Sequence, residues 1–332
     1  MTRLAAFLLA SLALCACEQP APESRAPATR QEPVVVYASH EDENYLPSLF
    51  AGFTRETGIP VTVRHRPEQQ IVSEVIEKRG SPPADVLLTR SVHGTWRAAD
   101  EGALRPLQSE TISDLVPVSL RDPDGYWTAI GFSAVDVVCG TGSDGDCQAV
   151  AAYEDLANPE FKGRLCLSSS SLATNRTLIA GLIDDHGVRP AELIVRGWIA
   201  NLALPPYETE ESLLQAVAAG TCAVAVASGR ALHELGGPAA AAVWPQPGYI
   251  DVTAAGIGRH ARSPDAARRL VEWLVDRDAQ SAQYAATGLR PVNPAVTAHP
   301  FEFPAPAAPR HVGTAGLYES DAARLAERAR WY

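Results

Sequence analysis

Residues 34–63 read VVVYASHEDENYLPSLFAGFTRETGIPVTV, and this stretch decides the fold class of the chain. Val34–His40 predicts a buried strand that ends in polar residues. Apolar residues then recur at helical spacing until the pattern stops at Gly58, as in a helix that ends at a glycine: Leu46, Leu49, Phe50 and Phe53. Ile59–Val63 predicts a second strand. The stretch is therefore expected to form a strand–helix–strand unit.

The same alternation continues along the chain. Ile71–Arg79 predicts a second amphipathic helix, Ala84–Arg90 a third strand and Trp96–Gly102 a short helix. Alternating strands and helices predict an α/β fold with a mostly parallel sheet flanked by helices, and such sheets bind ligands at the carboxyl ends of their strands. The first candidates for ligand binding are the polar residues at those ends: Ser39, His40, Glu41 and Arg90.

A run of four serines lies in residues 163–175, GRLCLSSSSLATN. Leu165–Leu167 predicts a short buried strand before the serines, and Leu178–Ile183 predicts an apolar helix after them. Serine caps helix N-termini and donates hydrogen bonds, and the positive end of a helix attracts anions. A serine run in this position is more often only a cap, so the motif alone is a weak indication of ligand binding.

The first 17 residues resemble the signal peptide of a bacterial lipoprotein. Arg3 is followed by an apolar run, Leu4–Leu14, that is too short to span a bilayer. The run ends in Leu14-Cys-Ala-Cys17, which resembles a lipobox, and Ala16 before Cys17 suits cleavage and lipidation at Cys17. A plain secretory signal is the alternative. Residues 18–32 are rich in Pro, Ala and charge without periodicity, as expected of a disordered tether.

Composition limits the class of function. About 315 residues follow the expected cleavage site, which is enough for more than one domain. The chain is 46% hydrophobic and 20% charged, as in ordinary globular proteins. A net charge of −11 argues against nucleic acid and anionic membrane surfaces as partners.

Four cysteines remain after the expected cleavage site: Cys139, Cys147, Cys166 and Cys222. An even number in an exported chain suggests two disulfides, with three possible pairings. We favour Cys139–Cys147, which would staple a glycine-rich hairpin, and Cys166–Cys222, which would join two strands far apart in sequence. Zinc is the alternative, but no Cys-x-x-Cys unit is present.

Several blocks together resemble periplasmic solute-binding proteins of ABC importers, most closely the ferric-iron-binding branch. The resemblance lies in residues 34–63, in the blocks 84–86, 101–107 and 120–129, in 153–166 (YEDLANPEFKGRLC), in 216–222 (AVAAGTC), in 249–256, in 266–289 and in 325–331. The blocks occur in the family order and cover nearly the whole mature chain. In that branch, cysteines at the positions of Cys166 and Cys222 pair, which supports the second favoured disulfide.

The resemblance implies a two-lobe periplasmic-binding-protein fold of type 2, with a two-strand hinge and a ligand cleft between the lobes. The expected first lobe consists of residues 33–128 and 250–332, although the C-terminal helix may instead pack on the second lobe, residues 129–249. Family members bind solutes, are not enzymes and need no cofactor. The resemblance thus implies a monomeric, membrane-anchored periplasmic lipoprotein that works with an ABC permease and ATPase.

The ferric branch carries two adjacent tyrosines several residues after the second cysteine, and phenolates suit Fe(III). Here the corresponding position holds Arg230 and Ala231, so iron cannot bind through that tyrosine pair. A guanidinium repels a cation and binds a carboxylate or phosphate. The branch also carries a histidine after its first strand, where Glu41 aligns best and His40 lies one residue early, so these two residues are candidate metal ligands.

Relatives that bind a metal together with an anion hold the anion at the position of the serine run. This implies an anionic or zwitterionic pocket, to which we assign the following residues: Ser169, Ser170, Ser171, Asn175, Arg90 and Arg230. The predicted solute is ferric iron or an anion, with phosphonates, phosphate esters and thiamine-type compounds as alternatives to iron.

Two other classes of function are alternatives to solute transport. A hydrolase is disfavoured because the sequence has no Gly-x-Ser-x-Gly, no His-Glu-x-x-His and no P-loop. A ligand-sensing or accessory lipoprotein of the same fold cannot be separated from a transport protein by sequence. Permease and ATPase genes beside this gene favour transport, and histidine-kinase genes favour sensing.

Overall fold

A computed structural model describes residues 32–332 except 78–82, 141, 236–240 and 297–317. The expected signal peptide, Cys17 and nearly all of the expected tether lie outside the described residues. Among the described residues, no helix is both long enough and apolar enough to cross a membrane.

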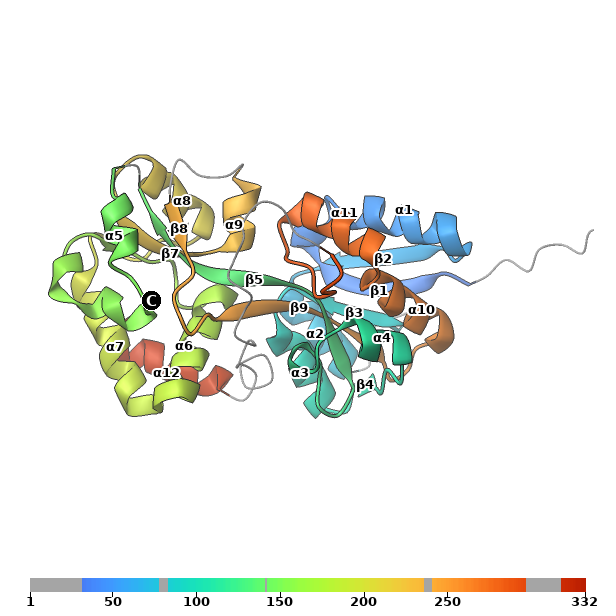
Figure 1. The fold of residues 1–332 in the computed structure, drawn as a ribbon. Helices are drawn as coiled ribbons and strands as arrows, with labels where there is room; N and C mark the ends of the chain where they lie inside the picture. The colour runs from blue at the N-terminus through green and yellow to red at the C-terminus, as the bar shows by residue number, and fades with distance from the viewer. Residues whose placement is uncertain (1–31, 78–82, 141, 236–240, 297–317) are drawn as a thin grey trace, which may run out of the picture. The chain divides into compact units, whose positions relative to one another are not determined.

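The first lobe is built on three parallel strands (Figure 1). Strand β1 (Val34–Ser39) lies between β2 (Val61–Arg66) and β3 (Val86–Thr89). The other elements of this lobe are as follows: the 3₁₀ turns η1 (His40–Asp42) and η2 (Val118–Leu120), the helices α1 (Leu46–Thr57), α2 (Glu68–Ile76), α3 (Val92–Asp100), α4 (Glu110–Leu115), α10 (Pro264–Leu274) and α11 (Arg277–Thr287), and the short strand β4 (Leu104–Arg105).

The second lobe is built around β7 (Val224–Ser228), which pairs in parallel with β6 (Leu165–Cys166). Its other elements are β8 (Ala241–Val243), the 3₁₀ turns η3 (Tyr153–Ala157) and η4 (Pro159–Phe161), and the helices α5 (Asp144–Gln148), α6 (Ala173–His186), α7 (Val188–Asn201), α8 (Glu210–Ala218) and α9 (Gly229–Glu234). The C-terminal helix α12 (Glu319–Ala329) packs against α6 and α7, beside the second lobe (Figure 1).

Two long strands connect the lobes (Figure 1). The 13-residue strand β5 (Trp127–Cys139) pairs through its first part with β9 (Ile250–Gly258) and through its second part with β7 and β8, all antiparallel. Strand β9 also pairs with β3 of the first lobe. The order β2-β1-β3-β9-β5-β7-β6 therefore runs continuously from one lobe to the other. This confirms the predicted α/β fold of two lobes joined by two strands.

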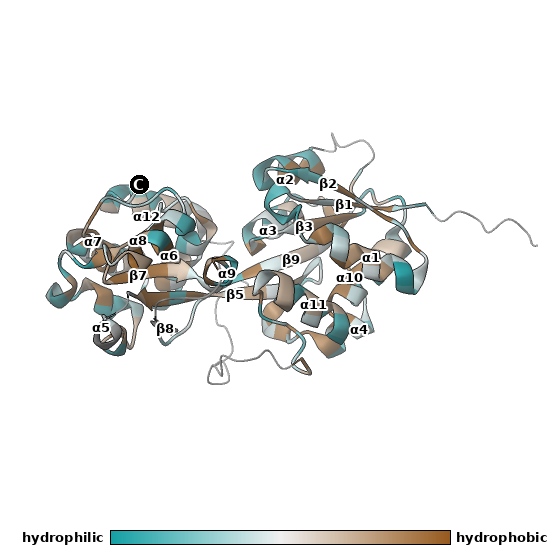
Figure 2. Cartoon of the chain, turned by 90° about the horizontal axis from the view of Figure 1, so that it is seen from above, coloured by the Kyte–Doolittle hydropathy of each residue, from teal (hydrophilic) through white to brown (hydrophobic). Residues whose placement is uncertain are grey.

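Each lobe has its own hydrophobic core. In the first, the buried face of α1, including Phe50 and Phe53, packs with β1 and with α10. In the second, Trp198 and Trp331 meet edge to face at 6.1 Å between ring centroids. Figure 2 shows the apolar residues concentrated on the strands and on the inward faces of helices. Burial of these faces stabilises the lobes, since buried apolar area contributes about 25 cal/mol per Å².

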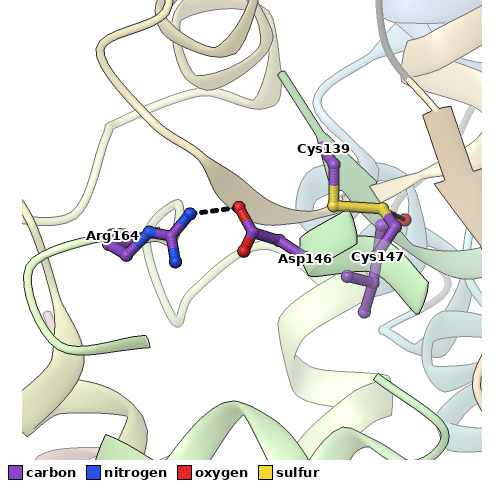
Figure 3. Close-up of a disulfide and its surroundings, with 5 residues drawn as sticks. Cys139, Asp146, Cys147 and Arg164 are labelled. Carbon is purple, nitrogen blue, oxygen red and sulfur yellow. Dashed lines mark hydrogen bonds and ion pairs between the residues drawn. A yellow bond between two sulfur atoms is a disulfide. The ribbon is translucent and has the colours of Figure 1, made fainter. Parts of the chain in front are cut away.

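The structure contains two disulfides, Cys139–Cys147 and Cys166–Cys222, which are the favoured pairings. We expected the first to staple a glycine-rich hairpin, and this expectation is wrong. This bond ties the end of β5 to the short helix α5, and Asp146 of that helix pairs with Arg164 (Figure 3). The second joins β6 to the residue two positions before β7, so it fixes the strand that leads into the serine run.

One buried carboxyl on β5 predicts a pH-dependent stability. Asp136 is buried, and its Oδ1 has no hydrogen-bond partner in the described part of the chain. Burial raises its pKa to about 7 despite the opposing charge of Arg290. The folded state thus keeps this proton up to about pH 7, whereas the unfolded chain releases it near its ordinary pKa of about 3.9. Stability from this group is therefore present at low pH and lost as pH rises toward 7.

We expect Asp136→Asn to remove this dependence, because the amide is shaped like the neutral acid. Relative to the wild type, the variant should gain about 2–3 kcal/mol of unfolding free energy between pH 5 and pH 8. Urea unfolding of both proteins at the two pH values measures the difference. Parallel pH profiles of the two proteins would contradict the account.

Candidate ligand-binding site

An ion-pair cluster lies at the carboxyl ends of β1 and β3. Arg90, directly after β3, places Nη1 2.9 Å from Glu41 Oε2 and 3.6 Å from Asp42 Oδ1. Its Nη2 lies 3.9 Å from Glu234 Oε1 on α9 of the second lobe. The backbone N–H of Arg90 donates to Glu68 Oε2 at 2.6 Å. Parallel strands bring these residues together because their carboxyl ends meet at one edge of the sheet.

Arg230 joins this cluster from the other lobe. It lies in the first turn of α9, directly beyond β7, and its Nη1 is 3.6 Å from Asp42 Oδ1. Its Nη2 donates to Thr253 Oγ1 on β9 at 3.0 Å, and its backbone N–H donates to Ser133 Oγ on β5 at 3.0 Å. The side chain is only 7% exposed. Arg230 therefore contacts both connecting strands and the first lobe at once.

The charges of the cluster are strongly coupled. Burial raises the pKa of Asp42, and the guanidiniums of Arg230 and Arg90 oppose this rise. Burial acts to lower the pKa of Arg90, but the carboxylates of Asp42, Glu41 and Glu234 outweigh it, so the pKa of Arg90 is raised. Among the described residues, the ion-pair partners of both arginines are thus carboxylates of the protein itself.

A second group of polar residues lies next to the two arginines and consists of Glu68, Ser91, His93 and Asp251. Burial raises the pKa of Glu68 to about 7, and it also raises the pKa of Asp251 on β9. Asp251 accepts a hydrogen bond from the Ser91 side chain, and Ser91 Oγ lies 2.7 Å from His93 Nδ1. Sequence reasoning missed Asp42, Asp251 and Thr253. Of these three residues, only Asp42 could have been predicted from the sequence, since it follows the polar residues at the carboxyl end of β1.

The serine run lies at the start of α6, in a turn that internal hydrogen bonds hold. Asn175 Nδ2 donates to Ser168 O, Ser168 Oγ and Ser169 O, while Ser169 Oγ and Ser171 Oγ are 2.9 Å apart. The expected serine cap is wrong, because α6 begins at Ala173 and its N-cap residue, Leu172, makes no side-chain cap. The serines are used instead to shape the turn that precedes the helix.

Ser170 holds the C-terminus. Its buried hydroxyl donates to Trp331 O at 2.7 Å, and Trp331 Nε1 donates to Ser168 O at 2.8 Å. Its proton is thus committed to the protein, and a ligand could meet only its oxygen lone pairs. Half-buried Ser169 and exposed Ser171 are the part of the run that keeps surface for a ligand.

We expect Ser170→Ala to lower the unfolding free energy by about 1–2 kcal/mol, because Trp331 O would lose its hydrogen bond in a buried place. Urea unfolding measures this loss, and Ser171→Ala, at an exposed position of the same run, is the matched control. Equal stability of Ser170→Ala and the wild type would show that the contact with Trp331 contributes nothing.

The predicted site residues thus fall into two groups. Glu41, Arg90 and Arg230 meet in the ion-pair cluster, and the serine run with Asn175 forms its own turn on the second lobe. Ser39 is buried, and its hydroxyl accepts from Glu41 N at 3.4 Å, while His40 is exposed. Glu210 on α8 lies between the groups, since it accepts hydrogen bonds from Ser228, directly before α9, and from Thr174 on α6.

The donors of the cluster do not form a metal cage. Among the described residues, no group of three or more His, Cys, Asp and Glu side chains is placed to hold a metal ion. One tyrosine, Tyr45, lies within electrostatic range of Asp42 and Arg230, and burial raises its pKa, which disfavours the phenolate. Two pockets of about 320 and 650 Å³ lie elsewhere, beside Tyr37 and His260 and beside Phe50 and Arg55 respectively.

The fold and this cluster define a class of protein. Residues 81–319 match the family of bacterial extracellular solute-binding proteins, and the chain belongs to that family. Proteins of this family bind solutes and are not enzymes.

The chain is similar to proteins of iron uptake. It is 30% identical over 285 residues to Iron uptake protein A1 of Synechocystis sp., covering 81% of this chain and 78% of that protein. It is 26% identical to the Fe(3+)-binding periplasmic protein of Serratia marcescens over 58% of this chain and 56% of that protein. Among solved structures, the Trichodesmium protein IdiA (FutA), in complex with iron and citrate ligands, superposes with a TM-score of 0.82 at 26% identity, covering 91% of this chain and all of that chain.

Proposed function

We propose that this protein is the solute-binding component of an ABC importer. It captures a small solute between its two lobes and delivers it to a permease. The observation that supports this most directly is Arg230, which reaches from the second lobe to Asp42 of the first and to Thr253 on a connecting strand. A solute bound at this point touches both lobes and stabilises their closure.

The solute we propose is anionic, either by itself or as an anionic chelate of ferric iron. Iron is suggested by the relatives, whose names refer to iron uptake and ferric binding. The anion is suggested by Arg90 and Arg230, whose pairings with Asp42 at 3.6 Å are longer than hydrogen bonds. Such loose pairs can exchange a protein carboxylate for a group of the solute. Ser169 and Ser171 are proposed as further contacts of the anion.

We also propose that the protein is anchored in the cell envelope by lipid on Cys17, with residues 18–32 as the tether and the permease and ATPase as partners. Residues 33–128 and 250–296 are assigned to the first lobe and residues 129–249 to the second. Helix α12 is assigned to the second lobe because it packs on α6 and α7. Metabolic labelling with a palmitate analogue tests the anchor, and label that persists in Cys17→Ser would refute it.

Calorimetry of the chelator-treated protein tests the proposed binding. Ferric citrate, citrate, phosphate, phosphonates and thiamine phosphates are titrated in turn. We expect saturable one-to-one binding of at least one of these anions. Hydrolysis of an ester or phosphate that disappears in Ser170→Ala would overturn the binding function, since it would make the protein an enzyme.

A further inference from the structure

The cluster contains more carboxylates than guanidiniums. Arg90 and Arg230 are the cations, with the His93 imidazole beside them, and the surrounding acidic residues are as follows: Glu41, Asp42, Glu68, Glu234 and Asp251. A purely anionic solute would enter a region whose carboxyl groups already outnumber its guanidiniums, and in which burial raises the pKa values of Asp42, Glu68 and Asp251. A solute that also carries a positive group would balance both sets of residues.

Three buried atoms in this region have no hydrogen-bond partner among the described residues: Asp42 Oδ1, Asp251 Oδ1 and His93 Nε2. Asp42 is 4% exposed and His93 is 8% exposed. Buried polar atoms are nearly always hydrogen-bonded, and each one left unpaired costs about 1–3 kcal/mol. These atoms therefore indicate a place where a further group binds.

The hydrogen bonds of Ser91 determine what kind of group fits. Ser91 gives its single hydroxyl proton to Asp251, so His93 Nδ1, 2.7 Å away, must donate to Ser91 Oγ. In the neutral imidazole, Nε2 is then an acceptor. Asp42 Oδ1 already faces both guanidiniums at 3.6 Å. Asp251 Oδ1 and His93 Nε2 are therefore the acceptors that call for a group made of donors.

A protonated primary amine meets this requirement, because it offers three donors and a positive charge. A metal ion does not, since the carboxylates of the described residues form no metal cage and two guanidiniums lie among them. Asp251 is the best-placed partner for the amine. Ser91 orients one of its oxygens and leaves Oδ1 free, and its electrostatic neighbours are His93 and Arg230.

We infer that the solute is a small zwitterion, whose primary ammonium group is bound by Asp251 and whose carboxylate, phosphonate or phosphate is bound by Arg90 and Arg230. This inference rests on the proposed solute-binding function and narrows its substrate class. The ammonium also supplies the cation that a buried carboxylate needs to stay ionised, since burial raises the pKa of Asp251.

Matched sets of compounds test the inference by calorimetry. One set holds acids with a primary amine, namely the protein α-amino acids, β-alanine and aminoalkylphosphonates. The second set holds the same acids without the amine, and the third holds the amines without the acid. We expect a member of the first set to bind at least tenfold more tightly than both of its matched counterparts.

The variant Asp251→Asn tests whether Asp251 binds the ammonium group of the solute. It should weaken binding of the amine-bearing acid at least tenfold and leave the binding of its deaminated counterpart unchanged, whereas a merely structural role would weaken both equally. Asp265→Asn, at an exposed position on α10, is the matched control. If Asp251→Asn does not fold, Ser91→Ala replaces it, because it removes the hydrogen bond that orients Asp251.

The outcomes separate this inference from the proposed function. Equal or tighter binding of a deaminated acid, or binding of ferric citrate or phosphate with no amine-bearing acid bound, overturns the zwitterion but keeps the solute-binding function. An unchanged affinity in Asp251→Asn removes Asp251 from the site. If none of the three sets and none of the ferric and anionic compounds binds, the proposed function itself fails.

Discussion

Arg230→Ala should weaken binding of the anionic solute at least tenfold. A hydrogen bond to a charged group contributes about 1.5–3 kcal/mol, and 1.4 kcal/mol corresponds to a factor of ten in affinity. Arg230 has a side chain that is 7% exposed and lies within 3.6 Å of Asp42, so no solvent cation takes its place. Calorimetry with the tightest anionic ligand of the wild type measures the loss.

Two further variants make this test specific. Arg230→Lys keeps the charge but loses the planar pair of donors, so its affinity should fall between those of the wild type and Arg230→Ala. Arg268→Ala removes an arginine on α10 that pairs with Asp265 and Glu272 of its own helix, and its affinity should be unchanged. An unchanged affinity in Arg230→Ala would remove Arg230 from the site.

Loss of the Cys166–Cys222 disulfide should be the most destabilising covalent change in the described part of the chain. This bond closes a loop of 56 residues, whereas Cys139–Cys147 closes one of 8. By the loop-entropy relation, the long closure contributes about 4 kcal/mol and the short one about 2.5 kcal/mol. The long bond also ties together β6 and β7, the paired strands that lead to the serine run and to Arg230.

Double variants measure this difference, because replacing one cysteine alone would leave a free thiol. Urea unfolding of Cys166→Ala/Cys222→Ala should show a larger loss of unfolding free energy than Cys139→Ala/Cys147→Ala. A larger loss in the second variant would show that the anchoring of α5 matters more than the long closure.

Much of the fold followed from periodicity. The helix at Leu46–Thr57 was predicted at its correct bounds, because four apolar residues recur on one face and Gly58 takes the left-handed conformation that ends the helix (φ 73°). Strand β2 was predicted two residues early. It is an edge strand with a half-exposed face, so its polar end, Arg64–Arg66, carries no hydrophobic signal.

Other elements depended on contacts that one sequence does not display. Helix α3 begins at Val92 and not at Trp96, because the poor helix formers His93 and Gly94 concealed its first turn. The glycine-rich segment after β5 forms the short helix α5 where a hairpin was expected. The predicted serine cap was wrong because α6 begins at Ala173 with Leu172 at its N-cap, and Ser170 is paired instead with Trp331, 161 residues away in the chain.

The site was predictable only in part, because some of its residues meet only through contacts between distant parts of the sequence. The rule that ligands lie at the carboxyl ends of parallel strands indicated Glu41 and Arg90, and the family resemblance indicated Arg230. Asp251 and Thr253 lie on β9, which is antiparallel to β3, so no rule about strand ends selects them. Their relation to Arg230 is tertiary, and it appears only when the two lobes are placed on their connecting strands.

The most direct test of the central claim is whether the protein binds Fe(III) in the absence of a coordinating anion. Chelator-treated protein is exposed to freshly dissolved ferric chloride or to ferric citrate, desalted and assayed for bound iron, while calorimetry follows the iron-free anions. Because arginine occupies the place of the tyrosine pair, we predict no retained iron from the chloride and saturable heat from an acid. Tight, stoichiometric retention of Fe(III) without any anion would contradict the account.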